Sequence, residues 1–246
     1  MSETRLVTQF REFDLHRYPS RRRELLRAWD AADEYLLQEL PMQELSGAKT
    51  LIVNDGFGAL ALGLYHLSPN SWTDSWLSHQ ALQENLKRNG FEPASVKVLP
   101  STETPESVYD LVLIKLPKSL ALLEDQLLRL KPLLKKESRV IVAGMVKTMP
   151  SSVWKMLEKI VGPTDTSLAL KKARLIHVSV DMDLPVPENP YPRSWAMEGT
   201  GFTISNHSNV FSRDRLDIGT RFLLQHLPET NGPQNIIDLG CGNGIL

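Results

Sequence analysis

The chain has 246 residues, with 28 Lys and Arg against 29 Asp and Glu, and a single cysteine. This length accommodates one large domain or two small ones, and 41% hydrophobic with 23% charged residues is typical of a globular protein rather than a disordered tail or a fibre. One cysteine excludes an internal disulfide and a cysteine-rich metal site, and no apolar run reaches the roughly 18 residues that span a bilayer. The first residues lack the apolar core of a signal peptide, so we expect a cytoplasmic protein with no membrane partner.

Apolar residues from position 23 to 180 recur alternately at helical and at strand spacing. The predicted helices cover residues 23–40, 59–65, 78–89, 119–134 and 151–161. The predicted strands cover residues 50–53, a short run around Trp72, and residues 96–99, 109–114, 139–143 and 169–180. Strands that alternate with helices favour parallel pairing, and therefore a doubly wound α/β sheet. The first twenty residues are Arg-rich and are predicted to be irregular.

A proline-rich stretch separates this region from the rest of the chain. Residues 181–194 contain four prolines and are predicted to form a stiff connector. We therefore expect a first domain over 1–180 and the start of a second domain over 195–246. In the second domain the sequence predicts a hairpin over 195–205 that turns at Gly199-Thr200-Gly201, a helix over 215–227 and a strand over 235–239.

The two regions contain an internal repeat. Residues 29–40 resemble residues 216–227 at a constant offset of 187, and each copy is followed by a predicted strand and a Gly-x-Gly turn. The same helix, strand and glycine turn in the same order indicate a duplicated domain whose second copy has only begun. We therefore expect a fragment of a protein that is longer by on the order of 130 residues.

The glycine turn of the second copy reads Asp238-Leu239-Gly240-Cys241-Gly242-Asn243-Gly244. Glycines after a strand allow a ligand to approach the backbone closely, because a Cβ there would collide with it. The spacing differs from that of a nicotinamide-binding turn. The string resembles motif I of class I S-adenosylmethionine-dependent methyltransferases; the alternative is a structural glycine turn in an unrelated α/β protein.

The first copy departs from that motif. Aligned on the glycines, Asn54 replaces the acid and Leu60 replaces the third glycine. Asp74, after the second strand, lies where an acid could bind the ribose hydroxyls, but a turn residue is an equal alternative. Residues 115–118 read Lys-Leu-Pro-Lys, where an amino-methyltransferase would carry Asn/Asp-Pro-Pro-Tyr/Phe. We expect the first copy to keep the fold without the chemistry.

The formal charge of −1 conceals a segregated distribution. Residues 115–174 carry thirteen bases and five acids, a local charge of +8, which indicates either an anion-binding face or a set of solvated lysines. Phosphate contacts from such groups would provide affinity with little sequence information. The candidate RNA-binding residues are Lys115, Lys118, Lys171, Lys172, Arg174, Arg21 and Arg22.

The sequence offers less support for base stacking, metal binding or a covalent nucleophile. Trp29, Trp72 and Trp76 could stack on unpaired bases, but burial in the core is the favoured interpretation. The six histidines and the carboxylates show no metal-ligand spacing, so we expect no metal site. The serines near residue 75 have no His/Asp partner pattern, so we expect no covalent nucleophile.

Taken together, these segments resemble the bacterial RlmG/RsmC family of duplicated-domain ribosomal RNA guanine-N2 methyltransferases, and most closely its RlmG branch. The resemblance rests on residues 31–37, 51–60, 168–176, 209–220 and 238–244. It implies a degenerate first domain that helps to bind RNA, a catalytic second domain that binds S-adenosylmethionine, and methylation of 23S ribosomal RNA. The implied cofactor-binding residues are Asp238, Gly240, Cys241, Gly242 and Gly244, with Thr220 and Phe211 as weaker neighbours.

The resemblance also limits what these residues can do alone. The Asn-Pro-Pro-Phe motif that carries the chemistry in that family is expected beyond Leu246, so no residue here is predicted to be catalytic. We expect the fragment by itself to be monomeric, inactive and weak in cofactor binding. The alternative function is a non-catalytic RNA-binding module with a degenerate methyltransferase fold.

Overall fold

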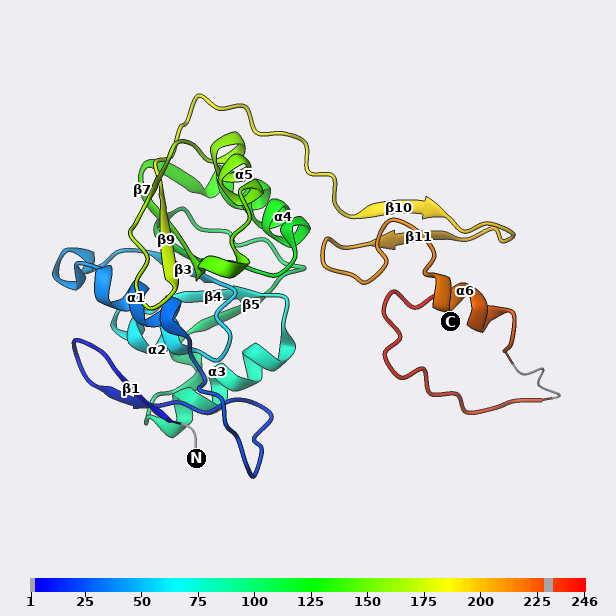
Figure 1. The fold of residues 1–246 in the computed structure, drawn as a ribbon, viewed down its shortest axis with the longest axis horizontal. Coiled ribbons are helices and arrows are strands. Elements are labelled where there is room, and N and C mark those ends of the chain that lie inside the picture. The colour runs from blue at the N-terminus through cyan, green and yellow to red at the C-terminus, as the bar shows by residue number, and fades with distance from the viewer. Residues whose placement is uncertain (1–2, 228–231) are drawn as a thin grey trace. The chain divides into compact units, whose positions relative to one another are not determined.

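The computed structural model describes residues 3–227 and 232–246, and the chain divides into two compact units, Met1–Pro187 and Glu188–Leu246 (Figure 1). Each unit is described by itself. None of the helices in the described residues is long and apolar enough to cross a membrane.

A mixed seven-stranded sheet organises the first unit, in the order β5-β4-β3-β6-β7-β9-β8 (Figure 1). The first five of these strands are parallel, as predicted, but β9 is antiparallel to both β7 and β8. Only six residues separate β8 from β9, and so short a connection can join antiparallel strands but not parallel ones. The strands are β3 (Thr50–Val53), β4 (Asn70–Thr73), β5 (Lys97–Pro100), β6 (Tyr109–Lys115), β7 (Leu134–Met145), β8 (Thr164–Thr166) and β9 (Ala173–Val178).

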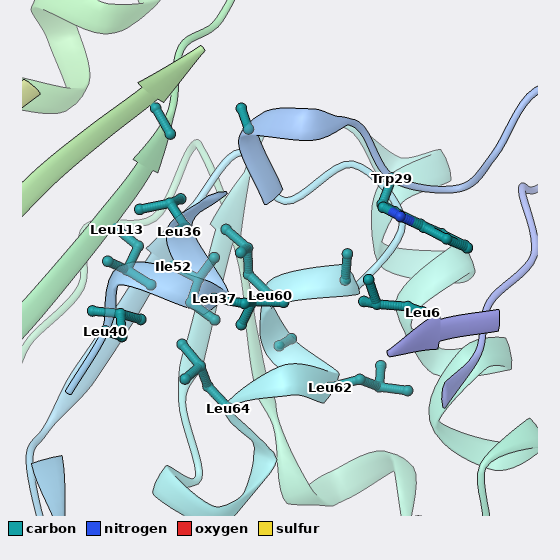
Figure 2. Close-up of a cluster of buried hydrophobic side chains, with 14 of the residues drawn as sticks. Leu6, Trp29, Leu36, Leu37, Leu40, Ile52, Leu60, Leu62, Leu64 and Leu113 are labelled. Carbon is teal, nitrogen blue, oxygen red and sulfur yellow. The ribbon is translucent and has the colours of Figure 1, made fainter. Parts of the chain in front are cut away.

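Helices cover both faces of this sheet. Helices α1 (Ala31–Glu39), α2 (Ala59–Gly63) and α3 (Trp76–Arg88) pack on one face, and α4 (Leu120–Leu130) and α5 (Ser152–Ile160) pack on the other. Successive strand residues alternate between the two resulting cores, which is why the strands read as continuous apolar runs. Figure 2 shows the first core, where Leu36, Leu37, Ile52, Leu60 and Leu113 meet. Short 3-10 helices follow several elements: η1 (Met42–Leu45), η2 (Tyr65–Leu67), η3 (Pro93–Ser95), η4 (Lys131–Leu133) and η5 (Val146–Thr148).

Helix α1 begins at Ala31 rather than at residue 23 as predicted. Asp30 accepts the backbone N–H groups of Ala32 and Asp33, and the Asp33 carboxylate accepts the N–H of Asp30, which together form a capping box. The apolar residue Leu26, which extended the helical pattern towards the N-terminus, is 62% exposed. The capping side chains therefore decide where the helix starts.

The opening residues form a hairpin that the sequence did not predict. β1 (Arg5–Val7) pairs with β2 (Glu12–Asp14) and buries Leu6 opposite Phe13. Asn85 of α3 and Asn89, which caps the end of α3, each accept a backbone N–H of this segment, at 3.0 and 2.8 Å. Three-residue strands are too short for an alternating pattern to show, so tertiary contacts with α3 determine this hairpin.

The second unit contains a hairpin and one short helix. β10 (Arg193–Ala196) pairs with β11 (Thr203–Asn206) across the predicted glycine turn, which confirms that hairpin. Helix α6 (Ile218–Leu224) is shorter than predicted, and the side chain of Asp217 caps its start. The predicted strand over 235–239 is absent: these residues have no regular secondary structure and pair with no strand of the described residues. A strand needs a partner, and the described residues of this unit offer none beside them.

Candidate functional site

The parallel strands β3, β4, β6 and β7 end at the same edge of the sheet, and β9 begins there. In open α/β sheets this edge is the usual place for a ligand. We call it the carboxyl edge, and define it by the residues directly after Val53, Thr73, Lys115 and Met145 and directly before Ala173.

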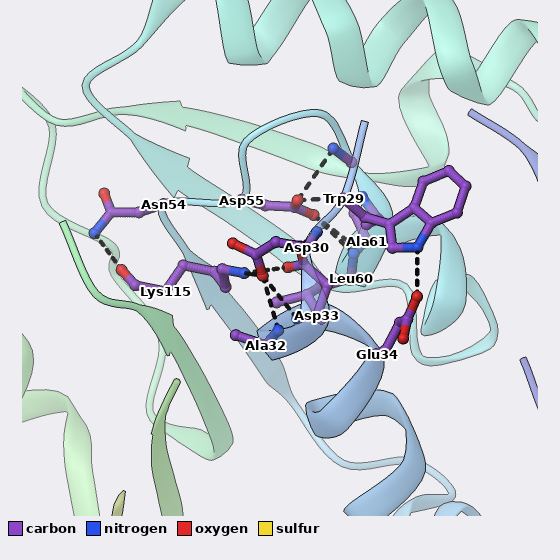
Figure 3. A network of polar contacts seen from close by, with 12 residues as sticks. Trp29, Asp30, Ala32, Asp33, Glu34, Asn54, Asp55, Leu60, Ala61 and Lys115 are labelled. Carbon is purple, nitrogen blue, oxygen red and sulfur yellow. Dashed lines mark hydrogen bonds and ion pairs between the residues drawn. The ribbon is translucent and has the colours of Figure 1, made fainter. Parts of the chain in front are cut away.

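The turn after β3 is closed by an acid of the protein itself. The buried Asp55 carboxylate accepts four backbone N–H groups at 2.9 to 3.1 Å, from Gly58, Ala59, Leu60 and Ala61 (Figure 3). These N–H groups belong to the first turn of α2, where a nucleotide-binding fold would place an anionic ligand. The Asp55 carboxylate therefore occupies the position that such a ligand would need.

A buried ion pair lies beside this turn. The Lys115 Nζ atom, at the end of β6, lies 2.6 Å from Asp30 Oδ1 and 2.8 Å from Asp33 Oδ1 (Figure 3). The Lys115 side chain is 13% exposed and that of Asp33 is 8% exposed. Leu111 and Leu113 of the same strand belong to the core under α1, and Lys115 continues their alternation. The Lys115 side chain therefore points inward and its charge is paired within the fold, so contact of Lys115 with RNA stays a prediction that this setting disfavours.

Amide groups complete this arrangement. The Asn54 and Gln126 side chains form two reciprocal hydrogen bonds of 2.9 Å, and the Asn54 amide also donates to the Lys115 carbonyl at 3.2 Å. Asn54 has a φ of 63°, which asparagine tolerates better than most residues. The asparagine that replaces the acid of the motif thus ties β3 to β6 and α4, which is a structural role.

Burial shifts the pKa values in this cluster. Desolvation raises the pKa of Asp33 to about 6, against the opposing charge of Lys115, and the nearby Asp30 and Asp55 carboxylates raise it further. Burial also raises the pKa of Asp55, although the backbone N–H groups favour its charged form. For Lys115, burial favours the neutral amine, but the Asp33 and Asp30 carboxylates outweigh it and hold the pKa above its ordinary value. The carboxyl edge of the first unit is therefore filled by mutually compensating charges and does not fit a nucleotide cofactor.

Exposed cations surround the filled centre. Lys118 follows β6, Lys147 follows β7 in η5, and Lys172 precedes β9, and the side chains of all three are exposed. The Val146 N–H donates to the Lys172 carbonyl at 2.9 Å, which holds the last two segments together. No ion pair joins any of these three lysines to a carboxylate within the described residues. Lys147 was missed in the sequence analysis; its position directly after a predicted strand, as for Lys118, was the available signal.

The other predicted RNA-binding residues lie in varied settings. Lys171 is exposed but forms an ion pair with Glu34 at 2.8 Å. Arg174 is half-buried on β9, and its Nε atom is buried without a partner. Arg21 and Arg22 are exposed on the loop before α1, whose ends are joined where the Arg17 guanidinium donates to the Arg27 carbonyl at 3.3 Å. RNA contact by these residues stays a prediction, and the charge of Lys171 is already partly neutralised by Glu34.

The tryptophans divide into two groups. Trp29 and Trp72 are buried, at 6% and 0% exposure, which confirms the core interpretation for them, but Trp76 is 63% exposed. Asp74 follows β4 directly and is exposed at the carboxyl edge. The position predicted for Asp74 is therefore correct, and its ribose-binding role stays a prediction.

The glycine segment of the second unit adopts a series of turns. Gly240, Gly242 and Gly244 have φ values of 85°, 57° and 73°, and the Gly244 N–H donates to the Cys241 carbonyl at 2.8 Å. A Cβ added at Gly240 or Gly244 would meet nothing within 4 Å. The backbone is therefore open to close approach by a ligand, as the predicted role requires.

This segment lacks the support that a strand would give. Ile237 and Leu239, which flank Asp238, are 90% and 96% exposed. Phe211 is 72% exposed, and the Thr220 N–H is used by the Asp217 cap of α6 at 3.0 Å. The predicted cofactor-binding residues of the second unit are thus accessible but not gathered on a rigid sheet edge.

Family models match both units. Residues 3–182 match the model described as "RLMG N-terminal domain", and residues 201–246 match the model described as "Methyltransferase small domain". The first of these covers more than half of the chain. The chain belongs to the RLMG N-terminal domain family. Within this family assignment, the carboxyl edge lies in the first matched region and the glycine segment in the second.

Curated relatives support the same family. The chain is 47% identical over 243 residues to ribosomal RNA large subunit methyltransferase G of Pseudomonas syringae pv. syringae, covering 98% of this chain and 65% of that protein. It is 46% identical over 248 residues to the protein of the same name in Streptomyces coelicolor, covering 98% of this chain and 66% of that protein. The chain thus spans just under two thirds of the length of these relatives.

A solved structure shares the fold. The structure titled as the T. thermophilus 16S rRNA N2 G1207 methyltransferase RsmC, in complex with AdoMet and guanosine, matches with a TM-score of 0.64. The sequences are 19% identical, and the match covers 91% of this chain and 57% of that one. At this identity the likeness shows the α/β methyltransferase-like fold.

The first unit also has a hollow that lies apart from the charged cluster. A hollow of about 560 Å³ lies at the opposite end of β7 from the carboxyl edge and is lined by Leu40, Arg139, Ile141 and His177 among others. It shares no residue with the charged cluster of Figure 3. Among the described residues, no group of three or more His, Cys, Asp or Glu could hold a metal ion.

Proposed function

We propose that this protein is an S-adenosylmethionine-dependent methyltransferase that modifies the exocyclic N2 of a guanine in 23S ribosomal RNA. The observation that carries the proposal is the alignment, over 98% of the chain, with relatives named ribosomal RNA large subunit methyltransferase G. The name of the structural neighbour, a 16S rRNA N2 G1207 methyltransferase, is consistent with methylation of a guanine N2 in ribosomal RNA. We propose further that the protein works as a monomer in the cytoplasm.

In this proposal the two units divide the work. The segment Asp238 to Gly244 would hold the cofactor, with Cys241 inside the turn and Thr220 and Phe211 nearby. When bound, S-adenosylmethionine supplies the methyl group, and the target guanine has to be unpaired or flipped out to reach it. The first unit would bind RNA through Lys118, Lys147, Lys172 and the neighbouring predicted cations.

The test uses the gene that encodes this sequence. Deleting it should remove one N2-methylguanosine from 23S ribosomal RNA and none from 16S ribosomal RNA, as measured by nuclease digestion and mass spectrometry. A plasmid copy should restore the modification, an Asp238→Ala copy should not, and a copy with Glu198→Gln, an exposed acid of the same unit, should. An unchanged 23S modification profile would contradict the proposal.

The cofactor affinity of residues 1–246 provides a separate prediction. Among the described residues no strand supports the glycine segment, and its flanking apolar residues are exposed. Ordering this segment around a ligand therefore costs free energy, which lowers the affinity. We expect these residues alone to bind S-adenosylmethionine more weakly than micromolar and to transfer no methyl group. Micromolar binding in isothermal titration calorimetry would contradict this expectation.

One observation favours the alternative of a non-catalytic RNA-binding module for the first unit. The Asp55 carboxylate and the Lys115 pair with Asp30 and Asp33 fill the carboxyl edge that a cofactor would need. A protein with only this unit would bind RNA without chemistry. Under this alternative, deleting the gene leaves the modification profile unchanged while RNA binding by the purified chain persists.

A further inference from the structure

Trp76 is unusual among the five tryptophans of the chain. It is the first residue of α3 and follows the end of β4 by three residues, so it lies at the carboxyl edge. Its side chain is 63% exposed, and its neighbour Leu77 is 48% exposed. Placing a large aromatic side chain in water forgoes the burial that normally accompanies it.

The other four indoles are all engaged. Each donates its N–H to a protein acceptor at 2.8 to 3.0 Å: Trp29 to Glu34, Trp72 to Glu103, Trp154 to Thr166 and Trp195 to Arg213. The Trp76 side chain has no hydrogen bond, ring contact or cation above its ring anywhere in the described part of the chain. Both its face and its N–H are therefore available to a ligand.

A helix cap and a packing contact hold the backbone around Trp76. The Ser75 hydroxyl accepts the Ser78 N–H at 3.2 Å and caps α3. Leu82, one and a half turns further along α3, packs against Gly58 of the turn after β3. A side chain on such a fixed backbone loses little conformational freedom on binding.

The charges along the edge indicate what this ligand is. Lys118, Lys147 and Lys172 lie next to β6, β7 and β9, which are two, three and four strands away from β4. At roughly 4.8 Å per strand they are about 10 to 19 Å from Trp76 along the edge. Trp76 offers an aromatic ring while these cations lie further along the edge, so the Trp76 end suits a base and the lysine end suits the phosphate backbone.

We propose that Trp76 stacks on an unpaired base of an RNA strand whose phosphates lie along Lys118, Lys147 and Lys172. This proposal rests on the proposed RNA-binding function and adds a contact that the phosphate-binding lysines do not provide. Stacking accepts any base, so it recognises single-stranded RNA without reading its sequence. A protein partner would meet three unpaired lysines on this edge, whereas RNA supplies the matching negative charge.

The experiment compares variants of the chain in binding a fluorescein-labelled single-stranded oligoribonucleotide of mixed sequence. Trp76→Ala should weaken binding by about 5- to 150-fold without changing the slope of affinity against salt, because stacking releases no counterions. Trp76→Phe keeps an aromatic face and should retain most of the affinity. Leu77→Ala, the matched loss of a neighbouring exposed apolar side chain, should bind as the unaltered chain does.

A second oligoribonucleotide, identical but with abasic sites, separates stacking from other contacts. Loss of the bases should remove the difference between Trp76→Ala and the unaltered chain. Equal binding of the intact RNA by both, with a normal salt slope, would overturn the stacking proposal and leave RNA binding by the first unit intact. Absence of RNA binding by the unaltered chain at low salt would overturn RNA binding by the first unit as well. Thermal unfolding would verify that each variant is folded.

Discussion

Two lysines three positions apart show how the setting of a residue decides its role. Lys115 lies on the strand and points into the core under α1, where Asp30 and Asp33 neutralise it. Lys118 lies beyond the strand end and is exposed. The sequence does not distinguish the two lysines, yet their settings differ, and the exposed Lys118 is the better candidate for a contact with an RNA phosphate.

Lys115→Met should therefore lower stability rather than RNA affinity. Removing the ammonium leaves Asp33 buried and unpaired, which costs about 3–5 kcal/mol of unfolding free energy. The double variant Lys115→Met with Asp33→Leu should recover part of this loss, because no buried charge then remains between them. Lys118→Met, the exposed counterpart, should change the free energy of unfolding by less than about 0.5 kcal/mol. Urea denaturation of the four proteins measures all of these values.

Asp33 should also make stability depend on pH in the mildly acidic range. Its pKa is about 6 in the folded protein and near 3.8 when unfolded, so between these values the folded state binds more protons than the unfolded state. The contribution of Asp33 to stability therefore falls as pH rises from about 4 to 6, by up to about 3 kcal/mol, and then levels off. Asp33→Asn should remove this fall from a series of urea unfolding curves.

Asp30→Asn provides the control for that series. The Asp30 carboxyl is half-exposed; burial favours its neutral form, but Lys115 and two backbone N–H groups outweigh this and hold its pKa below the ordinary value. Its contribution to stability is present above pH 3.8 and is lost as pH falls through the depressed folded pKa. The Asp30→Asn profile should thus lose this low-pH dependence and keep a fall between pH 4 and 6, made smaller because the Asp30 charge no longer raises the pKa of Asp33. A fall between pH 4 and 6 that persists in Asp33→Asn would contradict the assignment to Asp33.

At the scale of elements, the connection from β3 to α2 shows how a ligand-binding turn becomes a structural one. Asp55 binds the N–H groups of the first turn of α2, and Asn54 joins β3 to α4 through Gln126. Gly58 keeps the geometry of the glycine turn, with a φ of 89°, where α3 packs against it. The β3–α2 turn keeps its glycine geometry because α3 packs against it. The Asp55 carboxylate occupies the position that a ligand would take there.

Gly58→Ala should therefore destabilise the first unit by about 1–3 kcal/mol. An added Cβ would lie 2.8 Å from the Leu82 side chain and 3.2 Å from its Cα atom, on a backbone with positive φ. Gly56→Ala, two residues earlier, meets nothing within 4 Å and should be close to neutral. Thermal or urea unfolding of both variants checks this; equal losses would show that the turn tolerates a side chain at Gly58.

At the scale of the whole molecule, exposed lysines lie at both ends of the sheet of the first unit. Lys118, Lys147 and Lys172 lie at the carboxyl edge, the edge that also carries Trp76. Lys49, Lys97 and Lys136 lie at the starts of β3, β5 and β7, which is the opposite edge. Replacing the three lysines of either edge by Glu changes the net charge of the protein by the same amount, so the two triple variants are matched.

Reversing Lys118, Lys147 and Lys172 to Glu should weaken RNA binding by more than about tenfold and reduce the salt slope by about 2, since three phosphate contacts to a single strand are lost. Reversing Lys49, Lys97 and Lys136 should have a much smaller effect that is confined to low salt. Fluorescence anisotropy at several salt concentrations measures both. Equal losses at the two edges would show that the interaction follows net charge and not the carboxyl edge.

Local patterns predicted most of the elements of the first unit and the family itself. Apolar periodicity depends on neighbouring residues, so strands such as 50–53 and helices such as 151–161 appear close to their true bounds. The glycine string from Asp238 to Gly244 indicated a methyltransferase because the residues that allow close approach to the backbone are consecutive in the sequence. The hairpin with its turn at Gly199 was predictable for the same reason.

Only the tertiary structure decided what the charged residues do. Asp30 and Lys115 are 85 positions apart, and no local pattern shows that they meet; the same holds for Asn54 and Gln126, and for β9 returning antiparallel beside β7. The strand expected over 235–239 has no partner in the described residues, and pairing is a property of two segments and not of one. A sequence determines the preferences of each segment, but burial and charge compensation arise where distant segments pack. That is why the sequence identified the family, while the fold showed that Lys115 is structural and that Trp76 is exposed at the basic edge.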